Sequence, residues 1–157
     1  MKKILMVCLG NICRSPLAEA ILQDKLKKNG LDYVMVDSAG TASYHIGENP
    51  DPRTIANAQK HGLEIKHLVC RQFTVLDFDD FDKIYVMDSS NYRNVINLAK
   101  NEEDIKKVEL ILNVVNPNLN NPVPDPYFGG EDGFENVYKL LDEACDHIIN
   151  NISNRNL

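Results

Sequence analysis

The feature that most constrains this chain is a short loop near its N-terminus, between a strand pattern and a helix pattern. The apolar run from Ile4 to Val7 is too short for a helix and is bounded by turn residues, so it predicts a buried strand. From Ser15 onward, apolar residues recur every three or four positions, which predicts one buried face of a helix. The intervening loop has the form C-x5-R-S, in which Cys8 opens the loop and Arg14 closes it.

A loop at the start of a helix is suited to anions. The first backbone N–H groups of a helix have no intrahelical acceptors and carry partial positive charge. The amides between Cys8 and Arg14 can curl around a tetrahedral oxyanion, which the guanidinium grips from one side. The residues expected to contribute these amides are Leu9, Gly10, Asn11, Ile12 and Cys13. The same field favours the thiolate form of a cysteine, so the pattern predicts a nucleophile that faces a bound phosphorus atom.

The same residues also have a purely structural interpretation. A cysteine at a strand end is most often a small buried hydrophobe, and an arginine at a helix start is most often a surface charge. Two details favour the functional interpretation. Of the four cysteines only Cys8 has an arginine six positions later, and both Gly10 and Asn11 tolerate the left-handed backbone of a tight loop. Ser15 can cap the helix and can also donate its hydroxyl to the thiolate.

The segment from Cys8 to Glu19 resembles the phosphate-binding loop of the low-molecular-weight protein tyrosine phosphatases. Three further segments match family segments in the same order, so the resemblance covers essentially the whole chain; they are Ser38-Ala39-Gly40-Thr41, Asp51-Pro52-Arg53 and Asp125-Pro126-Tyr127. The resemblance implies Cys8 as nucleophile, Arg14 as phosphate clamp and Asp125 as general acid. It also implies Ser15 as the thiolate donor and Asn11 as the organiser of the loop.

The resemblance implies further roles outside the loop. Tyr44 and His45 fall where the family places side chains that select the substrate, often an aromatic that packs on the phenyl ring. Tyr127 belongs to the same aromatic wall, and Phe128 stands where many members have a second tyrosine. His67 falls where a family histidine can brace the loop asparagine, although a lone histidine is more often a satisfied surface or core residue.

The region of Asp125 is rich in Asn, Pro and Gly, and it is too long to be only a connector. An aspartate flanked by prolines is usually a turn former. A phosphatase, however, needs an acid to protonate the leaving phenolate, and a carboxylic acid on a rigid loop over the cleft would meet that need.

Strand and helix patterns alternate along the chain. Further strands are predicted at 33–36, 81–87 and 108–112, and helices after Asp51, after Asp88 and over 134–150. For Asp88 the helix N-cap is the favoured role, although it leaves a strand at the edge of the expected site. The alternation predicts an α/β fold in one domain spanning 1–157, with a four-stranded parallel sheet, helices on both faces and the phosphate-binding loop between first strand and first helix.

Composition excludes several classes of function. The 157 residues are 43% hydrophobic, which suits one domain with a real core. The net charge of −6 and the absence of a Lys/Arg-rich block argue against nucleic acid as a partner. The short apolar run before Cys8 does not match a signal peptide, and no stretch of about 18 apolar residues predicts a membrane span. We therefore expect a cytoplasmic protein; separately, we expect a monomer.

The cysteines and histidines do not predict a metal site. No C-x2-C pair occurs among Cys8, Cys13, Cys70 and Cys145, and the histidines lack the spacing of metal ligands. We expect reduced thiols, no metal and no cofactor. Cys13 either fills the loop as a small buried residue or forms a reversible disulfide with Cys8, which the family resemblance supports.

The predicted reaction is the two-step hydrolysis of phosphotyrosine in proteins, or of small aryl phosphates, through a phosphocysteine with inorganic phosphate as the product. An arsenate reductase of the same fold is an alternative, but it would need a pair of redox cysteines downstream. A silent phosphate-binding module is another; loss of Cys8, Arg14 or the acid would indicate it, and all three are present.

Overall fold

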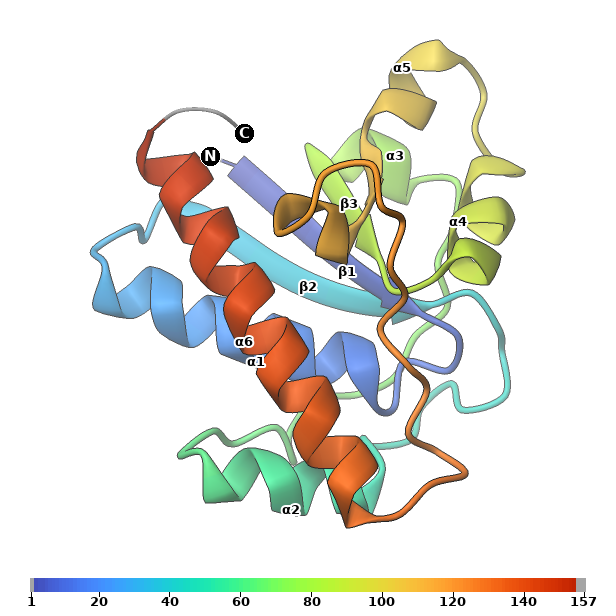
Figure 1. Cartoon of the computed structure of the whole chain (residues 1–157). Helices are drawn as coiled ribbons and strands as arrows, with labels where there is room; N and C mark the ends of the chain where they lie inside the picture. The colour runs from blue at the N-terminus through green and yellow to red at the C-terminus, as the bar shows by residue number, and fades with distance from the viewer. Residues whose placement is uncertain (1, 155–157) are drawn as a thin grey trace.

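The computed structural model describes residues 2–154 and has an α/β fold built on one parallel sheet (Figure 1). The strands are β1 (Lys2–Cys8), β2 (Val34–Gly40), β3 (Lys83–Val86) and β4 (Val108–Leu110). They lie in the order β2-β1-β3-β4, and every neighbouring pair is parallel. The predicted fold class is thereby confirmed.

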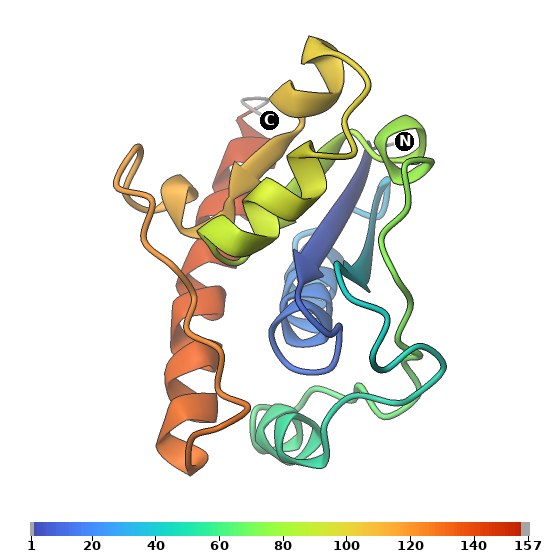
Figure 2. The ribbon, with the colours of Figure 1, turned by 90° about the vertical axis from the view of Figure 1, so that its right-hand side faces the viewer.

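Helices cover both faces of this sheet. The long helices α1 (Arg14–Lys28) and α6 (Glu131–Ser153) pack against each other on one face, and α2 (Pro52–Lys60) lies against α6 (Figures 1 and 2). On the other face, α4 (Ser89–Ile96) packs on β3 and β4. The remaining short helices are α3 (Asp77–Asp80), α5 (Glu102–Lys106) and the 3-10 helix η1 (Ile111–Val114).

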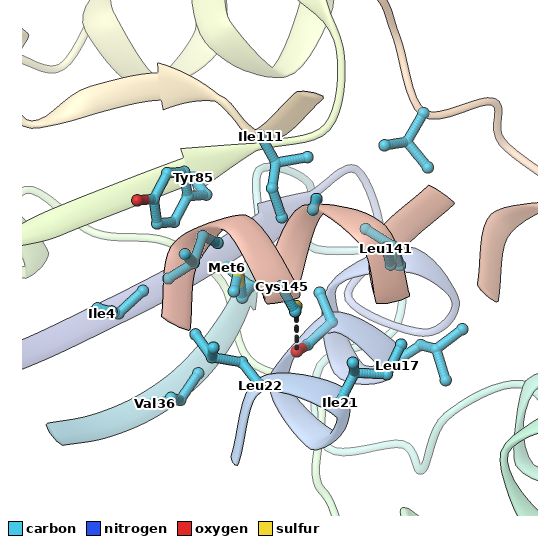
Figure 3. Close-up of a cluster of buried hydrophobic side chains, with 14 of the residues drawn as sticks. Ile4, Met6, Leu17, Ile21, Leu22, Val36, Tyr85, Ile111, Leu141 and Cys145 are labelled. Carbon is cyan, nitrogen blue, oxygen red and sulfur yellow. Dashed lines mark hydrogen bonds between the residues drawn. The ribbon is translucent and has the colours of Figure 1, made fainter. Parts of the chain in front are cut away.

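The central strand β1 is buried on both faces, which is why its sequence is a continuous apolar run. Ile4 and Met6 point into the core under α1 and α6, which Figure 3 shows around Leu22 and Leu141. Leu5 and the next alternate residue, Val7, point into the opposite core with residues of α3 and α4. Alternation of side chains along a strand places Cys8 on the α1 side of the sheet.

Several predicted boundaries were wrong. The second strand continues to Gly40 instead of ending at Val36, and the fourth ends at Leu110, after which the chain turns into η1. Ser15 does not cap α1: the helix begins at Arg14 with Cys13 at the N-cap position, and Ser15 is turned inward for other contacts. The sequence showed no periodicity for α3 and α5, because each is a helix of four or five residues.

The two predicted helix caps at Asp51 and Asp88 are confirmed. Asp51 accepts a hydrogen bond from the backbone N–H of Arg53, with Pro52 at the first helical position. Asp88 accepts one from the N–H of Asn91. Asp88 lies beside the loop after β1 because it follows β3, whose carboxyl end shares one edge with that of β1, and Asp51 lies there through the bond of its N–H to the Ile12 carbonyl oxygen at 2.8 Å.

At that edge the backbones approach closely. Cys8 is paired with Gly40 in the parallel register, and a Cβ added to Gly40 would lie 2.7 Å from the carbonyl oxygen of Leu9 and 3.0 Å from the amide nitrogen of Asn11. Only glycine fits where β2 passes the loop. The segment that precedes α6 lies at the same end of the sheet (Figures 1 and 2).

Within residues 2–154, no helix is long and apolar enough to cross a membrane.

The packing of α6 leads to a stability prediction. Leu141 is completely buried, whereas Leu140, its neighbour on the same helix, is only partly buried. We expect Leu141→Ala to lower the free energy of unfolding by about 2–5 kcal/mol, through lost apolar burial and the cavity left behind. Chemical denaturation measures this, with Leu140→Ala as the matched control. An equal cost for the two substitutions would contradict the assignment of the core.

Candidate active site

Cys8 lies at the carboxyl end of β1, where its thiol is surrounded by donors. It is 2% exposed, its Sγ lies 3.0 Å from the hydroxyl oxygen of Ser15, and the backbone N–H of Asn11 donates to it at 3.3 Å. The loop reverses at Asn11, which adopts a left-handed backbone with φ 58°. Gly10 does not share this conformation; a Cβ there would lie 3.1 Å from Cδ2 of His45, a tight contact with a side chain of the pocket rim.

The side chain of Asn11 is buried and fully hydrogen-bonded. Its Nδ2 donates to the hydroxyl oxygens of Ser15 at 2.8 Å and of Ser38 at 2.9 Å. Its Oδ1 accepts from the backbone N–H of Arg71 at 3.0 Å. Because its donors and acceptor are all engaged, this side chain holds the loop, the end of β2 and the segment before α3 together.

The structure does not place His67 against Asn11. His67 is exposed, and the three groups that bind the Asn11 side chain are the hydroxyls of Ser15 and Ser38 and the backbone of Arg71. The prediction that His67 braces Asn11 is therefore wrong, because those three groups already bind both ends of the Asn11 side-chain amide. Sequence reasoning missed this role of Ser38, although Ser38 opens one of the segments that matched the family.

Arg14 is 2% exposed and is anchored at one end of its guanidinium. Nη1 donates to Oδ2 of Asp88 at 2.7 Å and to the carbonyl oxygen of Val123 at 2.9 Å. Nη2 lies 3.7 Å from Oδ2 of Asp125. Burial alone would lower the pKa of Arg14, but Cys8 and these two aspartates together hold it above its ordinary value, so Arg14 stays charged. Asp88 thus serves both as the N-cap and as the anchor of Arg14.

These residues line one pocket at the edge of the sheet. Its lining comprises Cys8, Leu9, Gly10, Ile12, Cys13, Arg14, Tyr44, His45, Asp125, Tyr127 and Phe128. The floor is formed by the buried residues Cys8, Ile12, Cys13 and Arg14, whereas the rim is aromatic and open: Tyr44 is 73% exposed and Phe128 93%. The backbone N–H of Tyr127 donates to Oδ1 of Asp125 at 3.0 Å. The pocket thus places a thiol, a guanidinium and a carboxyl beside an aromatic wall.

All four cysteines are free and buried. Burial raises the pKa of Cys13 to about 12 and that of Cys70 to about 11, so both are neutral thiols near neutral pH. Cys70 donates from Sγ to the carbonyl oxygen of Asn11 at 2.8 Å, so Asn11 contacts Cys70 through its carbonyl and Cys8 through its N–H. Among the described residues, no three His, Cys, Asp or Glu side chains gather closely enough to hold a metal ion.

A chain of hydrogen bonds runs from the thiol into the core. From Cys8 it passes through Ser15, Asn11 and Ser38 and ends at Glu19, whose Oε1 accepts from the Ser38 hydroxyl at 2.6 Å. Glu19 is 7% exposed. Burial raises its pKa to about 7, while the Ser38 hydroxyl opposes the shift.

Glu19 leads to a pH prediction. The pKa of Glu19 is 4.5 in the unfolded chain and about 7 in the folded chain. At a pH between these two values, Glu19 is protonated in the folded chain and ionised in the unfolded chain. The protonated side chain therefore stabilises the fold fully when the pH is below the pKa of Glu19 in the unfolded chain. This stabilisation is lost as the pH rises through the pKa of Glu19 in the folded chain. The free energy of unfolding, relative to Glu19→Gln, should fall by about 1–3 kcal/mol over this window. Denaturation at several pH values measures it, with the exposed Glu143→Gln as control; a pH-independent difference would contradict the raised pKa.

Comparisons with known proteins agree with this geometry. The sequence model of the family described as low molecular weight phosphotyrosine protein phosphatase matches residues 3–156. A protein of that name from Schizosaccharomyces pombe is 42% identical over 153 residues, which are 96% of this chain and 97% of the relative.

Solved structures agree as well. The crystal structure of a protein tyrosine phosphatase from Entamoeba histolytica, with Hepes in its active site, is 35% identical and superposes with a TM-score of 0.93 over 100% of both chains. A drosophila arginine phosphatase is 34% identical, with a TM-score of 0.89 over 97% of this chain and 98% of the other. The chain belongs to the low molecular weight phosphotyrosine protein phosphatase family.

Proposed function

We propose that this chain hydrolyses phosphotyrosine and other aryl phosphate monoesters through a phosphocysteine on Cys8. The observation that carries the proposal is the grouping of Cys8, Arg14 and Asp125 in one aromatic-walled pocket at the start of α1. Family membership supports it, because this family consists of hydrolases named for phosphotyrosine.

In the first step the Cys8 thiolate attacks phosphorus in line with the leaving phenolate. The S–P bond forms as the P–O bond breaks, and Asp125 gives its proton to the phenolate oxygen. The Ser15 hydroxyl and the Asn11 amide donate to Sγ and stabilise the thiolate. Arg14, together with the other amides of the loop, holds the equatorial oxygens.

In the second step water attacks the phosphocysteine, and inorganic phosphate leaves. Asp125, now ionised, takes the proton of the attacking water, and Cys8 departs as the thiolate. Arg14 is ready to stabilise both transition states, because Asp88 and the Val123 carbonyl already fix its orientation.

The rim favours aryl substrates. The rings of Tyr44, Tyr127 and Phe128 stand around the buried loop and offer apolar surface to the phenyl group of phosphotyrosine. His45 also lines the pocket, and its Nδ1 lies 2.9 Å from Oε2 of Glu48. Phosphotyrosine proteins and small aryl phosphates are therefore the proposed substrates.

The proposal places the enzyme in the cytoplasm as a monomer. Cys8 must be reduced to act, and a reducing compartment keeps free thiols such as Cys8 and Cys13 in that state.

The test is hydrolysis of para-nitrophenyl phosphate and phenyl phosphate in reducing buffer with a chelator. We expect Cys8→Ser to abolish turnover, because the nucleophile is lost. Asp125→Ala should lower kcat/KM for phenyl phosphate by about 10²–10⁴-fold, because the leaving phenolate is no longer protonated. Asp32→Ala, an exposed aspartate before β2, is the matched control and should leave activity unchanged.

Other outcomes would overturn the proposal in distinct ways. Faster hydrolysis of phosphoarginine than of phosphotyrosine would assign the substrate class of the drosophila relative. Thiol-dependent reduction of arsenate without phosphatase activity would assign a reductase. Binding of inorganic phosphate with no turnover of any substrate would assign a binding module.

A further inference from the structure

Arg53 connects the phosphate loop with the segment that carries Asp125. Its guanidinium grips the carboxylate of Asp51 with two nitrogens: Nε donates to Oδ1 at 3.1 Å and Nη2 donates to Oδ2 at 2.9 Å. Asp51 is itself buried, and its backbone N–H donates to the carbonyl oxygen of Ile12 at 2.8 Å. The cation is therefore held in one orientation by a residue attached to the loop.

The other side of this guanidinium faces two aromatic rings. Its Cζ lies 5.3 Å from the ring centroid of Tyr127 and 4.9 Å from that of Phe134. Both distances are within the range in which a cation is attracted to the face of a ring. Phe134 is buried on α6, whereas Tyr127 is 38% exposed, so Arg53 joins the exposed ring to a buried one.

The position of Tyr127 in turn sets the direction of the Asp125 carboxyl. The Tyr127 amide donates to Oδ1 of Asp125 at 3.0 Å, and Oδ2 faces Nη2 of Arg14 at 3.7 Å. Shifting the Tyr127 backbone would release Oδ1 and let the carboxyl rotate. One continuous series of contacts thus leads from the loop to the acid, through Ile12, Asp51, Arg53, Tyr127 and Asp125.

We propose that Arg53 is a positioning residue, which aims the Asp125 carboxyl at the leaving oxygen by holding the ring of Tyr127. This inference rests on the proposed function, in which Asp125 is the general acid. The two rings and the two-point grip require a planar cation, so arginine suits the position and lysine replaces it only in part.

The test compares substrates that need the acid to different degrees. Phenyl phosphate has a poor leaving group, whereas dinitrophenyl phosphate has a good one that departs without a proton. We expect Arg53→Gln to lower kcat/KM by about tenfold for phenyl phosphate and by less than about twofold for dinitrophenyl phosphate. Arg53→Lys should recover part of the loss.

Two controls separate positioning from damage to the fold. Arg93→Gln removes an exposed arginine on α4 and should leave both substrates unaffected. Competitive inhibition by inorganic phosphate reports the loop, and its inhibition constant should change by less than about twofold in Arg53→Gln, because Arg14 keeps its anchors.

A double-mutant cycle tests the route through the ring. Tyr127→Leu should reproduce the loss selective for phenyl phosphate, and Tyr127→Phe, which keeps the ring, should give a smaller selective loss. If Arg53 acts through Tyr127, adding Arg53→Gln to Tyr127→Leu brings little further loss. Additive losses would overturn the proposed route.

Asp125→Ala, measured with the same substrates, distinguishes failure of this inference from failure of the proposed function. If Asp125→Ala affects phenyl and dinitrophenyl phosphate equally, Asp125 is not the general acid and the proposed mechanism fails. If Asp125→Ala discriminates between the substrates but Arg53→Gln lowers both equally, or neither, Arg53 has only a structural role or none and the positioning inference is overturned.

Discussion

The site depends on one tight reversal of the backbone between β1 and α1. Asn11 holds that reversal in a left-handed conformation, with its side chain bonded to Ser15, Ser38 and the Arg71 backbone. These bonds are buried, so breaking any one of them leaves a polar group unsatisfied. The loop is therefore pre-organised, because these bonds fix the positions of its amides and of the Cys8 thiol.

Arg14 connects this loop to segments that are distant in the sequence. Its guanidinium joins the start of α1 to Asp88 after β3 and to the Val123 carbonyl before α6, and it faces Asp125. Cys8, Asp88 and Asp125 together raise the pKa of Arg14 and so keep this buried cation charged, whereas burial alone would lower that pKa. One side chain thus sets the distance between the nucleophile's loop and the segment of the proposed acid.

The resemblance to a known family located most of the pocket, because the pocket residues fall within a few contiguous matching segments. Periodicity located the four strands and the long helices, since both faces of β1 and one face of α6 must be apolar. It could not locate α3 or α5, which are each about one turn long, nor the extension of β2 to Gly40, which is polar and is stabilised by register with β1.

The sequence by itself determined the order strand, C-x5-R loop, helix, and with it a buried sheet whose carboxyl edge carries an anion-binding loop. Only the tertiary structure decided which distant groups complete that loop. Ser38 and the Arg71 backbone bind Asn11, whereas His67 is exposed. Asp88 caps α4 and also binds Arg14. The physical reason is that periodicity reports which face of an element is buried, while hydrogen-bond partners depend on distances between elements that no local pattern contains.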